Sequence, residues 1–131
     1  MAKTTKYTIL VVDDNPDLIF SIEEGFKAVG KNLKVISANS GKSCLEVLRT
    51  QKPDAILLDI MMPGMDGWDV LAKVKANRST EKIPVIFLTA KTDPISVGMG
   101  KLSAAEYIEK PFDLKDLKRK IEAVIKKNKA K

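Results

Sequence analysis

Hydrophobic residues in this chain gather in five short runs, and the segments between them carry apolar residues at helical spacing. The runs are 7–12, 33–37, 55–59, 85–88 and 106–108. Most are almost continuously apolar, which is typical of strands buried on both faces of a parallel sheet. The alternation of strand and helix predicts an α/β domain with a mostly parallel sheet.

Helices are predicted from caps and apolar spacing over about 16–29, 40–49, 68–77 and 93–102, and from Asp113 onward. The residues expected to face inward are Leu18, Ile22, Phe26, Val29, Cys44, Leu45, Leu48, Val70, Leu71, Val74, Leu114, Leu117, Ile121, Val124 and Ile125. The helix at 93–102 is the weakest, because Gly98 and Gly100 each cost ~1 kcal/mol relative to alanine in a helix interior. We expect it to be short, mobile or partly unwound.

Length and composition indicate one soluble domain. The chain has 131 residues, 44% of them apolar, and no apolar stretch approaches the ~20 residues of a membrane span. The amino terminus lacks the apolar core and cleavage site of a signal peptide. We therefore expect a cytoplasmic protein with its domain at residues 6–128 and flexible ends at 1–5 and 129–131. The single cysteine, Cys44, is expected to be a core residue.

The net charge of +6 does not by itself indicate nucleic-acid binding. Much of the excess is lysine near the two ends of the chain, with no aromatic residues interleaved to stack on bases. The chain has no histidine, which excludes Ser-His-Asp and Cys-His nucleophile systems and His-ligated zinc. Any phosphohistidine in its chemistry must belong to a partner.

Reactive polar residues end or follow four of the predicted strands. They are Asp13-Asp14, Asp59, Thr89 and Lys110. In an open parallel sheet, ligands bind beyond the carboxyl ends of the strands, so these side chains are expected to converge. Two carboxylates about 4 Å apart repel by ~4 kcal/mol at an effective dielectric of 20, which a hard cation such as Mg²⁺ would relieve. A carboxylate is also a competent nucleophile for phosphorus, so the set predicts phosphoryl-transfer chemistry.

These residues, with Pro111-Phe112 after Lys110 and the Met-Pro-Gly-Met-Asp-Gly loop at 62–67, resemble the receiver domain of two-component response regulators. The resemblance covers residues 6 to 128, in order and spacing together, and is closest to stand-alone receivers of the chemotaxis type. It implies a doubly wound, flavodoxin-like (βα)5 fold with five parallel strands in the order 2-1-3-4-5.

The resemblance also implies roles for the acidic residues. Asp59 would be the phosphoacceptor, and Asp13, Asp14 and Asp59 would hold Mg²⁺ together with the backbone carbonyl of Met61. Mn²⁺ or another divalent cation could take the place of Mg²⁺. The protein would promote its own phosphorylation and dephosphorylation rather than act as an enzyme on other molecules.

Further roles are implied for residues on the last two strands. Thr89 and Lys110 would bind the phosphoryl oxygens, and Tyr107 would turn inward as Thr89 moves. The Lys110–Pro111 peptide would be cis, which is a minority state for such bonds.

The implied donor is a histidine kinase or phosphotransfer protein, and the implied output is contact with a downstream protein. The family uses the face built by the helix predicted at 93–102, the strand at 106–108 and the final helix, through which a weak homodimer could also form. No membrane partner is implied. Because no effector domain follows, output would be by protein contact, or the chain would be a fragment of a longer protein.

The sequence also departs from the family pattern. The separation of Thr89 and Lys110 is one residue shorter than usual, and Ser103 stands where the family often has glycine. Met61 and Lys91, each two residues past a site residue, offer no carboxylate or carboxamide to orient a hydrolytic water. We therefore predict slow autodephosphorylation.

Two other functions remain open from the sequence. A receiver-like scaffold that no longer accepts phosphate would work by docking or dimerising alone. A metal-dependent phosphohydrolase of the haloacid-dehalogenase type would form a similar aspartyl-phosphate. That class has a second acid two residues after its nucleophile, where this chain has Met61.

Overall fold

The five predicted strands form one sheet in the computed structural model, which describes residues 7–29, 32–90 and 104–130. The strands are β1 (Tyr7–Val12), β2 (Leu33–Ala38), β3 (Ala55–Asp59), β4 (Val85–Thr89) and β5 (Glu106–Glu109). Every neighbouring pair is parallel, and the order is β2-β1-β3-β4-β5. The predicted fold class and strand order are therefore confirmed, with strand ends within one residue of those predicted.

Four helices lie in the described part of the chain. They are α1 (Pro16–Val29), α2 (Gly41–Thr50), α3 (Gly67–Ala76) and α4 (Leu114–Lys129). The helix predicted at 93–102 lies outside the described residues, so α4 is the helix that was predicted last. It continues one residue past the expected domain limit, and the Nζ atom of its Lys129 lies 3.1 Å from a carboxylate oxygen of Asp54.

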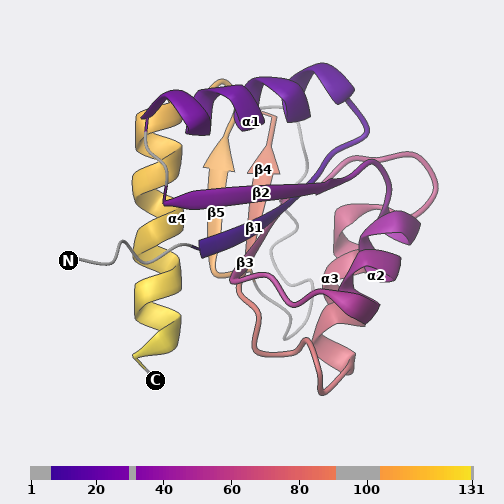
Figure 1. Cartoon of the computed structure of the whole chain (residues 1–131). Helices are drawn as coiled ribbons and strands as arrows, with labels where there is room; N and C mark the ends of the chain where they lie inside the picture. Colours follow the sequence, from indigo (N-terminus) through magenta and orange to yellow (C-terminus); the bar gives the residue numbers. More distant parts are fainter. Residues whose placement is uncertain (1–6, 30–31, 91–103, 131) are drawn as a thin grey trace.

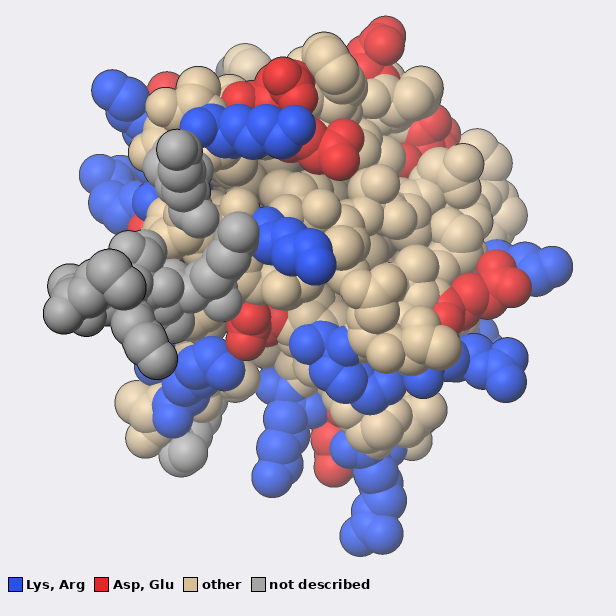
Figure 2. All heavy atoms as spheres, viewed as in Figure 1, with Lys and Arg blue, Asp and Glu red and all other residues tan. Residues whose placement is uncertain are grey.

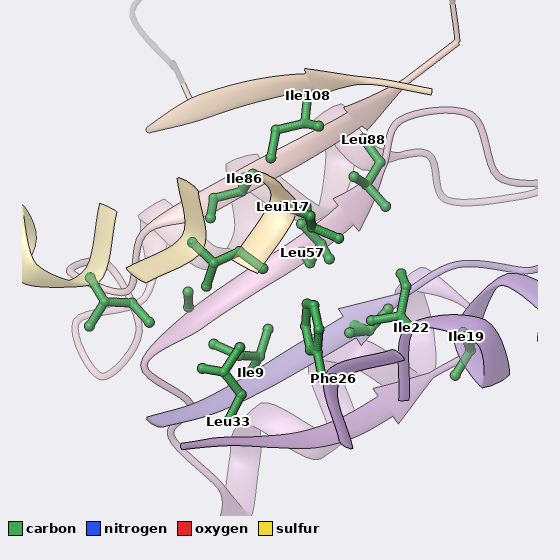
Figure 3. Close-up of a cluster of buried hydrophobic side chains, with 14 residues drawn as sticks. Ile9, Ile19, Ile22, Phe26, Leu33, Leu57, Ile86, Leu88, Ile108 and Leu117 are labelled. Atoms are coloured by element: carbon green, nitrogen blue, oxygen red, sulfur yellow. The ribbon is translucent and has the colours of Figure 1, made fainter. Parts of the chain in front are cut away.

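The helices cover the two faces of the sheet in pairs, α1 and α4 on one face and α2 and α3 on the other (Figure 1). Alternate residues of β1 point to opposite faces of the sheet. Ile9 and Val11 belong to the apolar cluster under α1 and α4, which Figure 3 shows, whereas Leu10 and Val12 belong to the cluster under α2 and α3. Burial on both faces explains why this strand is apolar almost throughout.

The predicted inward-facing residues are confirmed at the centre of each helix and need correction at the edges. Ile19 was not predicted to face inward but is only 8% exposed. Five predicted residues are half-buried at the margins of the two clusters, namely Leu18, Val29, Leu45, Leu114 and Val124. A core-facing helical stripe is more than 100° wide, so residues beside its central row fall at its border. None of the described helices is long and apolar enough to cross a bilayer.

The cysteine is a core residue, as predicted: Cys44 is fully buried on α2 and free of any disulfide. Burial raises the pKa of its thiol to about 12. Because the thiolate is the reactive form, we expect native protein at pH 8 to resist alkylation by iodoacetamide. The protein unfolded in urea should be alkylated fully. Intact mass measured with and without urea checks this, and equal rates in the two states would contradict it.

Candidate functional site

The carboxyl ends of three neighbouring strands bring the predicted site residues to one edge of the sheet. Asp13 directly follows β1, Asp59 is the last residue of β3, and Thr89 is the last residue of β4. The register pairs Val12 with Leu58 across β1 and β3, so both strands end at the same level. Parallel strands with a shared end level therefore account for the convergence predicted from the sequence.

Three carboxylates form a compact cluster at this edge. One carboxylate oxygen from each of Asp13, Asp14 and Asp59 lies within 4.8 Å of the others. Asp13 and Asp59 are 1% and 5% exposed, whereas Asp14 is exposed. Asp13 is also held locally, because its Oδ1 atom accepts a 2.9 Å hydrogen bond from the backbone N–H of Asn15.

Lys110 reaches into the cluster from the segment after β5. Its Nζ atom lies 3.4 Å from Oδ2 of Asp13 and 3.4 Å from Oδ1 of Asp59. The backbone N–H of Lys110 donates to the carbonyl of Thr89 at 2.6 Å, which ties this segment to the end of β4. The Lys110–Pro111 peptide is cis. A single ammonium group therefore lies between two buried carboxylates.

The electrostatics of the cluster are unbalanced in favour of negative charge. The pKa of Asp59 is raised to about 6, first by burial and then by the negative charge of Asp13, while Lys110 opposes the rise. Carboxylate oxygens no more than 4.8 Å apart repel by roughly 3 kcal/mol or more per pair at an effective dielectric of 20. Clustered carboxylate oxygens are hard ligands that suit Mg²⁺, so the donor set fits this ion.

Among the other predicted residues, Thr89 ends β4, Met61 follows β3 by two residues and Tyr107 lies on β5. Thr89 is 3% exposed and Met61 is 54% exposed. Tyr107 is half-buried on β5, and its ring centre lies 5.7 Å from that of Phe87 on β4. Lys91 lies outside the described residues, so its role stays a prediction.

The loop after β3 contains structural features that the sequence analysis missed. Asp66 and Asp69 form a reciprocal capping box at the start of α3, with hydrogen bonds of 3.0 and 3.2 Å. A Cβ atom on Gly67 would lie 2.7 Å from the carbonyl oxygen of Asp59, so only glycine fits there. The acids three residues apart before an apolar helix were the signal that could have revealed this cap.

The Response regulator receiver domain model matches residues 9–122. The chain belongs to this family. Two curated relatives are a probable cyclic di-GMP phosphodiesterase of Vibrio cholerae and the DNA-binding response regulator MtrA of Mycolicibacterium smegmatis. The first is 38% identical over 132 residues, covering 100% of this chain and 29% of the relative. The second is 37% identical over 126 residues, covering 95% of this chain and 53% of the relative. This receiver domain thus spans about half or less of their length.

Two solved structures share the fold of this receiver domain. A CheY-like response regulator receiver domain protein from Methanospirillum hungatei has a TM-score of 0.81 and 32% identity, covering 95% of this chain and 98% of that chain. The receiver domain of the sensor histidine kinase PA1611 from Pseudomonas aeruginosa has a TM-score of 0.78 and 27% identity, covering 92% of this chain and 98% of that chain. It is described with a magnesium ion coordinated in its active site cleft.

Proposed function

We propose that this receiver domain is a phosphorylation switch in which Asp59 accepts a phosphoryl group from a phosphohistidine on a partner protein. The observation that carries the proposal is the Lys110 ammonium group, 3.4 Å from both Asp13 and Asp59 at the edge of the sheet. The donor imidazole lies outside this sequence, which has no histidine.

In the proposed transfer, a carboxylate oxygen of Asp59 forms a new P–O bond while the P–N bond of the donor breaks. The bonding electron pair leaves with the imidazole nitrogen. Lys110 balances charge on one phosphoryl oxygen, and the hydroxyl of Thr89 donates a hydrogen bond to another. Positioning and charge neutralisation supply most of the catalysis in such a transfer.

Asp13, Asp14 and Asp59 would hold Mg²⁺, assisted by the backbone carbonyl of Met61. The support is the set of three carboxylate oxygens within 4.8 Å, together with the magnesium named for the PA1611 receiver domain. Once bound, the ion would offset the repulsion among the carboxylates and the charge of the phosphoryl oxygens. Mn²⁺ offers similar oxygen chemistry.

Incubation with acetyl phosphate and Mg²⁺, followed by intact mass, tests the proposal. We expect the wild type to gain the mass of one phosphoryl group, and the Asp59→Asn variant and the wild type in EDTA to gain none. An unmodified wild type would favour the scaffold alternative. Sustained turnover of phosphomonoesters would favour a phosphohydrolase.

An apolar groove of about 540 Å³ next to the cluster offers a docking place for the phosphodonor. It lies between α1 and the segment before α4, and its lining residues are Leu18, Ser21, Ile22, Lys110, Pro111, Phe112 and Leu114. Because Lys110 belongs both to this groove and to the carboxylate cluster, a partner seated here would bring its phosphohistidine close to Asp59.

A large side chain in this groove should slow phosphoryl transfer from a protein donor, but not from a small-molecule donor. Ser21 is exposed and lines the groove, so Ser21→Arg would block it without disturbing the core. We expect transfer from the histidine kinase or phosphotransfer protein that phosphorylates the wild type to fall about tenfold or more. Phosphorylation by acetyl phosphate should be unchanged. Phe20→Arg is the control, because Phe20 is 63% exposed on the same helix but does not line the groove.

We further propose that the phosphorylated domain acts on a protein partner, or on a second copy, through the side that carries β5 and α4. The segment 93–102, which the family also uses here, lies outside the described residues. No aromatic residue interleaves with the basic residues of α4, so nothing in this helix favours base stacking. The DNA-binding name of MtrA belongs to a relative of which this chain covers 53%.

The phosphorylated state is expected to be long-lived because of Met61. Its side chain is 54% exposed two residues beyond Asp59, and it has no group that could orient a hydrolytic water. Met61→Asn should therefore speed loss of the phosphoryl group roughly tenfold, a modest gain for positioning a water. Decay of the phosphorylated mass after donor removal measures this. Met61→Leu is the apolar control, and unchanged decay in Met61→Asn would contradict the prediction.

A further inference from the structure

A second groove lies on the opposite face of the domain, between α2 and α3, with a volume of about 610 Å³. Four exposed cationic side chains line it: Lys42, Arg49, Lys52 and Lys73. None of the four forms an ion pair with a described residue, whereas lysines such as Lys27, Lys118 and Lys129 pair with carboxylates elsewhere. Figure 2 shows Lys and Arg side chains gathered at the lower right, where α2 and α3 lie in Figure 1.

Part of the lining of this groove is apolar. Leu45, Leu48 and Met65 line it, and Leu45 and Met65 are only half-buried, so apolar surface faces the groove. Glu46 is the one carboxylate among the described residues that line the groove, and four cations against this one anion leave them a net charge of +3. Positive charge without carboxylate partners around a half-buried apolar strip favours a ligand that is acidic on its flanks and apolar along its middle.

The lining residues of the groove favour a helical protein segment over other anions. Lys42, Leu45, Glu46 and Arg49 follow one another at helical spacing, so one long face of α2 lines the groove. In the described part of the chain, the residues that line the groove include no aromatic side chain to stack on a base. A groove lined along two turns of one helix by apolar and basic residues matches the binding of an amphipathic helix by its apolar stripe. Complementary charge then selects among such helices.

We infer that the α2–α3 groove is a docking site for an acidic amphipathic helix of a partner protein. The apolar stripe of that helix packs on Leu45, Leu48 and Met65, and its flanking carboxylates face Lys42, Arg49 and Lys73. This surface is separate from the carboxylate cluster, and its binding does not require phosphorylation of Asp59. Failure of phosphotransfer would therefore leave the inference untouched.

Two synthetic peptides of equal composition test this docking site on the full chain. One carries leucines at positions i, i+3, i+4 and i+7 with glutamates elsewhere, and the other has the same residues scrambled. We expect the amphipathic peptide to bind at least ten times more tightly, measured by fluorescence anisotropy. Its binding should shift the amide resonances of α2 and α3 but not those of α4.

A pair of charge-reversal variants separates the groove from general electrostatics. Lys42→Glu with Lys73→Glu should weaken binding of the amphipathic peptide at least tenfold. The control is Lys115→Glu with Lys127→Glu, which makes the same change in net charge at exposed α4 residues that have no ion pair among the described residues. It should bind as the wild type does. Circular dichroism confirms that each variant is folded.

Three results would overturn the inference. One is equal weakening in the two double variants. Another is binding of inorganic triphosphate or a duplex DNA oligonucleotide at the groove as tightly as the amphipathic peptide. The third is self-association of the free protein that only the groove variant abolishes, measured by sedimentation, which would assign the groove to a second copy of the chain.

Discussion

Replacing Asp59 with asparagine is expected to stabilise the metal-free protein at pH 8 by about 2–3 kcal/mol. Burial and the charge of Asp13 raise the pKa of Asp59 from 3.8 to about 6. Below pH 3.8 the carboxyl group is neutral in both the unfolded and the folded protein. Between pH 3.8 and about 6 the unfolded state has lost this proton while the folded state still holds it, so the free energy of unfolding falls across this range and stays low above it. Asparagine is neutral at every pH and avoids this loss.

Urea unfolding at pH 4 and pH 8, in EDTA, measures the effect. We expect the advantage of Asp59→Asn to be small at pH 4 and full at pH 8. Mg²⁺ should stabilise the wild type, because it binds the folded state only, and should stabilise the variant less. Asp14→Asn is the matched control. Asp14 is an exposed member of the same cluster, so its replacement should raise the free energy of unfolding by less. A variant that is less stable than the wild type at pH 8 in EDTA would contradict this account of Asp59.

Replacing Lys110 with methionine is expected to slow phosphorylation by acetyl phosphate roughly 10²–10³-fold. Methionine retains much of the aliphatic length of lysine and removes the ammonium group that lies 3.4 Å from Asp13 and Asp59. The transferring phosphoryl group then lacks one of its charge partners. Lys110 also lowers the pKa of Asp59, so the variant should need a higher pH to reach its maximal rate.

The rate of mass gain at saturating Mg²⁺, measured from pH 5 to pH 9, tests both effects of Lys110→Met. Lys129→Met is the matched control, because Lys129 pairs with Asp54 at the other edge of the sheet. Its rate and pH profile should match those of the wild type. A slower rate with an unshifted pH profile would mean that Lys110 assists the transfer but does not set the pKa of Asp59. An unchanged rate would show that Lys110 has no role in the phosphorylation of Asp59.

The fold was predictable because a strand that is buried on both faces is apolar at almost every position. β1 and β3 are almost continuously apolar, and their predicted ends agree with the structure. Helix margins were less predictable. Ile19 and Leu18 are neighbours on α1, and only packing decides that Ile19 is buried while Leu18 lies at the border of the cluster.

The candidate site was predictable for a topological reason. A parallel sheet places all strand ends at one edge, so acids after β1 and β3 must meet once the strands are neighbours. The same logic cannot find the α2–α3 groove. Its basic residues lie on or just after two helices whose outer faces look like ordinary solvated faces in the sequence. Only helix packing sets them around the half-buried side chains of Leu45 and Met65.

The amino-acid sequence by itself determined the parallel α/β fold, the identities of the carboxylates and lysine at the strand ends, and the receiver family they indicate. The spacing of apolar residues and the residue types at strand ends are local properties, so they are visible in the amino-acid sequence. Only the tertiary structure decided that Asp13 and Asp59 are buried together with Lys110 between them, and that the pKa of Asp59 is raised to about 6. Desolvation and charge–charge energies depend on distances through space, which no spacing along the sequence specifies.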